Sequence, residues 1–163
     1  MHAVWSGLGA LIAELPHMHY FFGKITTYNQ LGEQARAILF TFMDTYFRDG
    51  EELVRPKPEF FVEHSCPDLR YRNLFSGNDY KRDFAVARDV FSQLGESIPP
   101  LFISYAGLST TMRSFGTARN PHFGNVHETA ILVRIADIRP KYINTFVDGY
   151  ESVNPGIFQA QAV

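Results

Sequence analysis

The sequence predicts one mixed α/β domain in which central strands are flanked by helices. Its 163 residues, 45% of them hydrophobic, suffice for a single core and are too few for two. Two runs, residues 20–28 and 130–135, have the aromatic and β-branched composition of strands. Apolar residues at helical spacing occupy much of the remaining chain. We therefore place a single domain over residues 1–150 and a loop-like tail over residues 151–163.

The first elements are predicted to be a helix and then a strand. Apolar residues from Val4 to Leu15 follow helical spacing, and Pro16 ends that helix. Residues 20–28 then form a strand, which we expect in the centre of the sheet, and the aromatic side chains of this strand are expected in the core. A glycine inside a strand marks a bulge, a packing requirement or a close approach to the backbone, so Gly23 is a candidate for any of these.

The second helix follows at once. Asn29 is its expected cap, and Asp49 with Gly50 is its expected end. Its apolar face consists of Leu31, Ala35, Ile38, Leu39, Phe42, Tyr46 and Phe47. Residues 51–77 carry repeated proline and glycine signals, which predict a long loop with one short strand-like stretch at residues 60–62.

The second half of the chain is expected to contain three more helices and the remaining strands. Asn78 is placed as the cap of one helix, which ends at Gly95, and Pro100 lies in the first turn of a short one. The apolar residues 130–135 predict a buried strand. Pro140 then begins a last helix.

Composition excludes several classes of function. Fifteen Lys and Arg residues against seventeen Asp and Glu residues leave a net charge of −2, which gives no attraction to nucleic acid or to an anionic membrane. No apolar run approaches the roughly 18 to 20 residues that a membrane-spanning helix needs. Cys66 is a lone cysteine and cannot form an internal disulfide. We expect a cytoplasmic protein with no nucleic-acid partner.

Metal and thiol chemistry have weak support in the sequence. His17 with His19, and His64 with Cys66, have the i, i+2 spacing that points two side chains to one side of a strand. A structural zinc site needs four ligands, and no spacing brings the two pairs together. Cys66 also lacks an assignable histidine partner for nucleophilic catalysis. We predict no metal site.

A succession of short motifs resembles one known family. In chain order they are WSGL at 5–8, YFFGKIT at 20–26, RPKP at 55–58, IPPL at 98–101, NPHF at 120–123 and PKY at 140–142. Together they resemble the hemolysin-like acyltransferases of the GNAT superfamily, which include the ornithine-lipid N-acyltransferases. The resemblance extends over residues 1 to about 148 and implies the C-terminal half of a GNAT-like acyltransferase fold.

The resemblance also implies that part of the family's fold lies upstream of Met1. That part supplies the early strands and the loop whose backbone amides hold the cofactor pyrophosphate at a helix N-terminus. The first predicted helix agrees, because it begins at the first residues without a capping side chain. We therefore expect the C-terminal portion of such a domain or a shortened gene product. Where the family carries acidic residues, this chain has Asn120, His122 and His127.

The strand at residues 20–28 corresponds, by this resemblance, to the one along which the thioester arm of the donor lies. This implies that Gly23, Thr26 and Asn29 bind the cofactor and that Tyr28 donates a proton to the leaving thiolate. The donor would be acyl-CoA or the phosphopantetheine of an acyl carrier protein, used as a co-substrate and not bound tightly. An ordinary strand, an aromatic packing residue and a helix cap are the alternative interpretation of these residues.

His127 and Glu128 are the candidates for the general base. An amine loses a proton as it attacks a thioester, and a histidine with a pKa near 6.5 accepts one near neutral pH. A histidine at a strand end with no catalytic role is the alternative.

Two functions of different classes follow. The first is an N-acyltransferase that moves a fatty acyl group from an acyl thioester to an amine acceptor, with this chain alone inactive. The second is a non-catalytic acyl-binding or protein-interaction module. In either case an unpaired sheet edge predicts a homodimer or a higher homo-oligomer.

Overall fold

The computed structural model describes residues 2–63, 68–71, 73–148 and 150. Within them the helices are α1 (His2–Glu14), α2 (Glu33–Phe47), α3 (Tyr80–Gln93), α4 (Pro100–Leu108) and α5 (Pro140–Phe146). The strands are β1 (Tyr20–Thr27), β2 (Arg113–Asn120) and β3 (Val126–Arg134). The predicted mixed α/β class is confirmed, whereas the domain limits at 150 stay a prediction and the tail at 151–163 lies outside the described residues.

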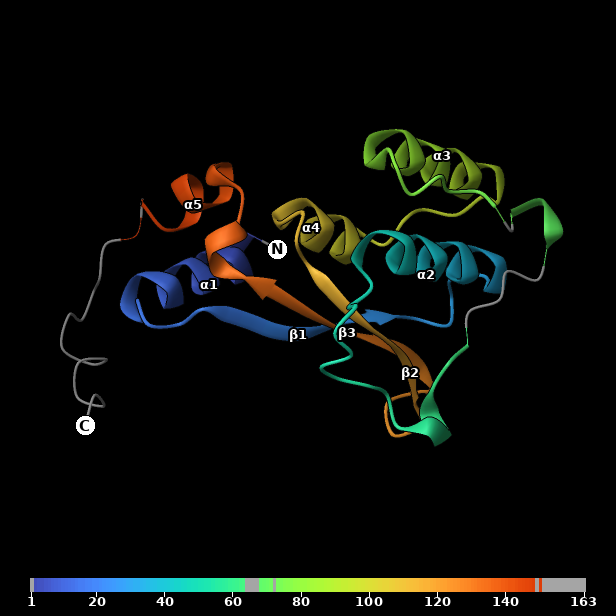
Figure 1. The fold of residues 1–163 in the computed structure, drawn as a ribbon, viewed down its shortest axis with the longest axis horizontal. Coiled ribbons are helices and arrows are strands. Elements are labelled where there is room, and N and C mark those ends of the chain that lie inside the picture. The colour runs from blue at the N-terminus through green and yellow to red at the C-terminus, as the bar shows by residue number, and fades with distance from the viewer. Residues whose placement is uncertain (1, 64–67, 72, 149, 151–163) are drawn as a thin grey trace.

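The three strands form an antiparallel sheet in the order β1-β3-β2. The central strand is therefore β3, as its apolar run suggests, and β1 lies at an edge (Figure 1). The expectation that residues 20–28 form a central strand is wrong for this sheet. Aromatic and β-branched residues are enriched in strands because they pack well on a pleated, partly buried sheet surface. This composition does not distinguish a central strand from an edge strand. The arrangement is consistent with part of a GNAT-like fold.

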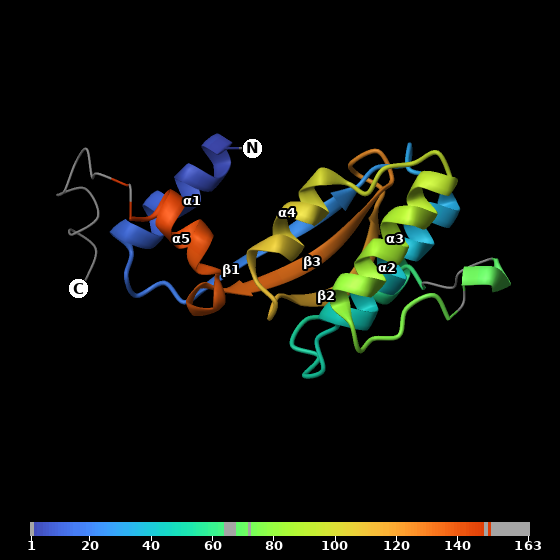
Figure 2. The same ribbon diagram turned by 90° about the horizontal axis from the view of Figure 1, so that it is seen from above.

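Helices α2 and α4 lie over one face of the sheet, and α3 lies on the same side, packed against α2 and farther from the strands (Figure 1). Seen from above, α2 and α3 run side by side, and α1 with α5 lies beyond one end of the sheet (Figure 2). On the covered face Ile25 and Ile131 are buried. On the opposite face Phe22 is 61% exposed, and its ring centroid lies 6.1 Å from that of Phe115. The expected burial of Phe22 is therefore wrong.

The core is centred on Phe42 of α2. This side chain is 1% exposed, and its ring meets six other aromatic rings at centroid distances between 4.8 and 6.5 Å. These rings belong to Tyr46, Phe47, Phe75, Tyr80, Phe84 and Phe102. Edge-to-face geometry dominates, which is the arrangement that aromatic quadrupoles favour. The cluster joins α2 to α3 and α4 above the sheet.

Two predicted helix caps are displaced. Helix α2 begins at Glu33 after Gly32, and the Asn29 side chain instead donates from Nδ2 to the carbonyl oxygen of Gly124 at 3.0 Å. Helix α3 is capped by Asp79, whose carboxylate accepts from the backbone N–H of Arg82. The cap positions predicted at Asn29 and Asn78 are therefore wrong, because any nearby Asn or Asp satisfies the same sequence signal.

The segment at residues 48–63 runs along the outer edge of β2. Arg48 forms a parallel bridge with Ser114, and Phe61 forms an antiparallel bridge with Ala118. A strand-like stretch was expected at residues 60–62. The structure has a 3-10 turn at Pro58–Phe60 followed by the single bridge between Phe61 and Ala118. Within the described residues the outer edge of β1 has no such cover.

Candidate functional site

Five of the six predicted site residues lie together where β1 ends and β3 begins. They are Thr26, Tyr28, Asn29, His127 and Glu128. Thr26 is paired with Glu128, and Thr27 with His127. Tyr28 and Asn29 follow directly in the chain. Antiparallel pairing causes this meeting, because it places the end of one strand beside the start of its neighbour. Gly23 lies farther along β1, opposite Ile131.

Glu128 lies on the uncovered face of the sheet and is held by two neighbours. Its Oε1 lies 2.6 Å from Nζ of Lys24 on β1, and its Oε2 accepts from Nδ2 of Asn120 on β2 at 3.1 Å. The side chain is 15% exposed. Since a carboxylate has about four acceptor positions, each oxygen of Glu128 can accept another hydrogen bond. The group is oriented and still able to receive an ammonium.

His127 lies on the opposite face, beneath α2. Its side chain is buried, and its ring centroid lies 5.8 Å from that of Phe40. Burial lowers the pKa of His127, and the positive charges of Arg36 and Arg119 lower it further. The imidazole is therefore neutral near pH 7. Because successive strand residues point to opposite faces, His127 and Glu128 cannot contact the same reacting atom directly.

Two buried polar atoms beside this pairing have no hydrogen-bond partner among the described residues. They are Nδ1 of His127 and Oγ1 of its cross-strand neighbour Thr27. Thr27 is 2% exposed. The structure thus places His127 in an apolar, closed environment rather than at an open surface.

Tyr28 and Asn29 line a cavity of about 280 Å³ at the end of the sheet. The other lining residues are Gln30, Phe123, Gly124 and Val126. Tyr28 and Phe123 are each 56% exposed, so both aromatic rings are accessible. The bond from Asn29 to Gly124 joins the loop after β1 to the β2–β3 turn and so fixes the two walls of the cavity relative to each other.

Gly23 lies in an exposed part of β1. A Cβ atom added there would meet nothing within 4 Å, so packing within the described chain does not require glycine. The position therefore leaves the β1 backbone accessible at an uncovered strand.

Sequence reasoning missed Lys24 as a partner of Glu128 and noted Asn120 only for the acid that it replaces. The alternation of side chains along a strand could have indicated this partner, because Lys24 and Thr26 lie on one face of β1 and Glu128 lies on the same face of the neighbouring β3.

His64 and Cys66 lie outside the described residues. No group of three or more His, Cys, Asp or Glu side chains in the described ranges is arranged to hold a metal ion. None of the described helices is long and apolar enough to cross a membrane.

Two curated proteins are similar to this chain. The glycine N(alpha)-acyltransferase of Bacteroides thetaiotaomicron is 40% identical over 151 residues, which covers 90% of this chain and 44% of that protein. The glycine N(alpha)-acyltransferase of Phocaeicola vulgatus is 38% identical over 148 residues, which covers 88% of this chain and 45% of that protein. The chain thus spans less than half the length of these relatives. No protein-family model and no solved structure matches it.

These similarities support a relationship with acyltransferases. The relatives' names specify glycine as the amine and do not mention a hemolysin or an ornithine lipid.

Proposed function

We propose that this chain forms part of an N-acyltransferase that transfers an acyl group from a thioester to the amine of glycine or of a related small amine. The observation that carries the proposal is the 40% identity, over 151 residues, with a glycine N(alpha)-acyltransferase. In this reaction the amine nitrogen attacks the thioester carbon and forms the new C–N bond. The C–S bond breaks, the nitrogen loses a proton, and the thiolate takes one up.

The donor is proposed to lie along the uncovered edge of β1. Acyl-CoA and the phosphopantetheine of an acyl carrier protein both carry amide groups, which can pair with the free backbone groups of an edge strand. The missing side chain at Gly23 allows a close approach. The thioester end of the arm is proposed to lie near Thr26 and Asn29, because Thr26 pairs with Glu128 at that end of β1.

The acceptor is proposed to meet the uncovered face of the sheet. Glu128 would accept a hydrogen bond from the neutral amine and take one proton from its nitrogen as that nitrogen attacks, while the exposed hydroxyl of Tyr28 would give one proton to the thiolate. The burial of His127 supports Glu128 as the residue that contacts the amine. A hemolysin-like or ornithine-lipid type of enzyme would use the same groups with a different amine.

A second candidate is a non-catalytic acyl-binding module. It is favoured by the bare edge of β1, whose backbone groups can pair with the amides of a thioester arm. In that case the thioester arm binds to β1 without turnover.

The experiment measures thiol release from a long-chain acyl-CoA and from an acyl carrier protein by a chimaera in which the matching segment of the Bacteroides thetaiotaomicron relative is replaced by this chain. Glycine, ornithine and lysine are compared as acceptors, and release should depend on glycine. Glu128→Gln should lower kcat by about 100-fold or more, which is the usual loss with a general base. Asp89→Asn, an exposed acid on α3, is the matched control and should have no effect. Amine-independent release, or full activity of Glu128→Gln, would contradict the proposal.

A further inference from the structure

Three basic side chains of the described strands lie on the uncovered face of the sheet. They are Lys24 of β1, Arg113 of β2 and Arg134 of β3. Arg113 pairs with Leu132, which pairs with the exposed Phe22, and the other two lie two residues from this pair along their strands. Strand alternation therefore places all three cations on the face that carries Phe22.

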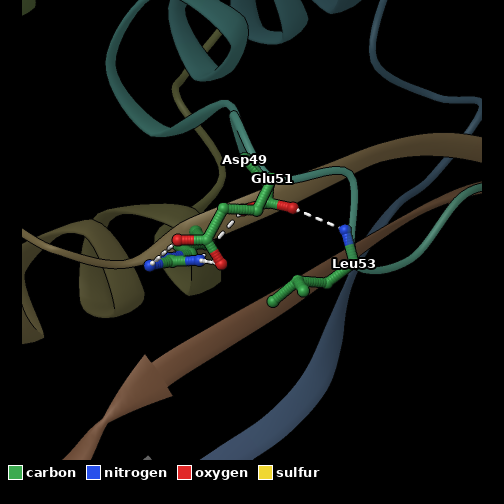
Figure 3. A network of polar contacts seen from close by, with 4 residues as sticks. Asp49, Glu51 and Leu53 are labelled. Atoms are coloured by element: carbon green, nitrogen blue, oxygen red, sulfur yellow. Dashed lines mark hydrogen bonds and ion pairs between the residues drawn. The ribbon is translucent and has the colours of Figure 1, made fainter.

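Arg113 is already engaged by two carboxylates (Figure 3). Its Nη1 lies 3.2 Å from Oδ1 of Asp49 and 2.9 Å from Oε2 of Glu51. Asp49 is itself fixed, since its Oδ2 accepts from the backbone N–H of Leu53 at 2.9 Å. The guanidinium thus joins β2 to the segment at residues 48–63 and is not open to a substrate.

Arg134 lies at the other end of the face from Glu128. Six residues of β3, about 20 Å at the usual rise of a strand, separate the two. Its Nη1 also lies 3.9 Å from Oδ1 of Asp137. Of the three cations, Lys24 is therefore the one beside Glu128.

Glu128 has one rigid partner and one flexible partner. Nδ2 of Asn120 donates to Oε2 of Glu128 at 3.1 Å, while Oδ1 of the same amide accepts from the backbone N–H of His122 at 3.1 Å. Lys24 contacts Oε1 at 2.6 Å through a side chain that is 57% exposed and has a flexible four-carbon stem. An exposed ion pair adds little to stability, so Lys24 can leave Oε1 at small cost while Asn120 keeps Glu128 in place.

An amino-acid acceptor would use both of these charged groups. Glycine, the acceptor in the proposed function, carries its amine and its carboxylate on one carbon atom, so the groups that bind them must be close neighbours. Glu128 can accept a hydrogen bond from the amine, and Lys24 offers a cation to the carboxylate. An amine without a carboxylate would displace Lys24 from Oε1 and offer it no anion in exchange.

We propose that Lys24 binds the carboxylate of the acceptor and so selects α-amino acids over simple amines. When the acceptor binds, its amine takes the place of Lys24 at Oε1 of Glu128, and the ammonium of Lys24 moves to the carboxylate. Asn120 holds Oε2 throughout. This inference rests on the proposed function, because it assigns a specificity-determining residue to the acceptor of that reaction.

Kinetics of the chimaera with glycine and with glycinamide test the proposal. Glycinamide has an amine but no carboxylate, so glycine should have the higher kcat/KM. Lys24→Met should raise the KM for glycine at least about tenfold and change kcat less than about twofold, because Lys24 contacts a part of the acceptor that does not react. The KM for glycinamide should not rise. Both acceptors are measured with both enzymes, so the difference in basicity between their amines cancels.

Two further variants control for charge and for folding. Lys24→Arg keeps the cation and should retain most of the preference for glycine. Lys81→Met, which removes an exposed lysine on α3, is the matched control for Lys24→Met and should behave like the natural sequence. Circular dichroism verifies that each chimaera is folded.

Binding without turnover separates this inference from the proposed function. Isothermal titration calorimetry measures the Kd of glycine for the chimaera in the presence of free CoA, and Lys24→Met should raise that Kd at least about tenfold. Such binding without any thiol release would contradict the proposed function and support Lys24 as the carboxylate-binding residue. Glycine-dependent release with an unchanged KM in Lys24→Met, or an equal preference for glycinamide, would overturn the inference and leave the proposed function intact. A folded chimaera that neither binds glycine nor releases thiol would overturn both.

Discussion

Phe42 and Phe22 show how burial decides the importance of a single aromatic residue. Truncation of Phe42 to alanine removes a ring that is 1% exposed and meets six others, so the free energy of unfolding should fall by about 3 to 5 kcal/mol. Phe22→Ala should cost less than about 1 kcal/mol, since most of that ring is in solvent. Urea unfolding of both variants measures the difference. Equal losses would show that the uncovered face of the sheet is buried in solution.

His127 should make stability depend on pH. Its pKa is lowered in the folded chain, whereas the unfolded chain titrates near the ordinary value of about 6.5. Between the two values the unfolded chain binds a proton that the folded chain does not. Stability is therefore full above about pH 6.5 and decreases as the pH falls toward the lowered pKa.

The measurement compares urea unfolding between pH 7.5 and pH 5 for the natural chain and for His127→Gln. The variant should lose less stability over this range. His122→Gln, which removes an exposed histidine, serves as control and should behave like the natural chain. An unchanged pH dependence in His127→Gln would refute a lowered pKa.

The sequence indicated candidate site residues on two separate strands, but neither how these strands pair nor which faces the residues occupy. His127 and Glu128 are adjacent in the chain, and strand alternation alone separates them to opposite sides of the sheet. Which of the two faces the helices cover depends on contacts such as that between His127 and Phe40, which are distant in sequence. The hydrogen bond from Asn29 to Gly124 could not be predicted from the sequence either, because it joins two loops that are 95 positions apart.

At the scale of elements, two glycines in α1 should respond in opposite ways to alanine. A Cβ at Gly9 would lie 1.9 Å from the carbonyl oxygen of Phe146 in α5, so Gly9→Ala must push the two helices apart. A Cβ at Gly7 would meet nothing within 4 Å. Gly9→Ala should destabilise the chain by about 1 to 3 kcal/mol, and Gly7→Ala should stabilise it by up to about 1 kcal/mol.

Thermal unfolding of the two variants is the measurement. Because both substitutions raise helix propensity equally, their difference isolates the contact between α1 and α5. Equal shifts of Tm for the two variants would refute that contact.

Helices were the most predictable elements. The apolar spacing of α2 and the prolines at the starts of α4 and α5 are local signals, and the structure confirms these helices. The order of the strands was not predictable, because β1 pairs with β3 across about a hundred residues. Only the pairing itself shows that β1 is an edge strand.

At the scale of the whole molecule, the uncovered edge of β1 should lead to self-association. Unpaired backbone groups on an edge strand recruit other chains, and the exposed Phe22 adds apolar area beside them. Sedimentation velocity at tens of micromolar should show a dimer or a larger species, and Phe22→Lys should reduce it. A clean monomer of the natural chain would contradict this prediction.

The central claim is that this chain supplies one part of an acyltransferase site. The direct measurement uses a chimaera in which the matching segment of the Bacteroides thetaiotaomicron relative is replaced by this chain. We predict thiol release from acyl-CoA that depends on glycine and falls with Glu128→Gln, whereas the 163-residue chain alone shows no turnover. A folded chimaera that releases no thiol would contradict the account, and so would robust glycine-dependent turnover by the 163-residue chain alone.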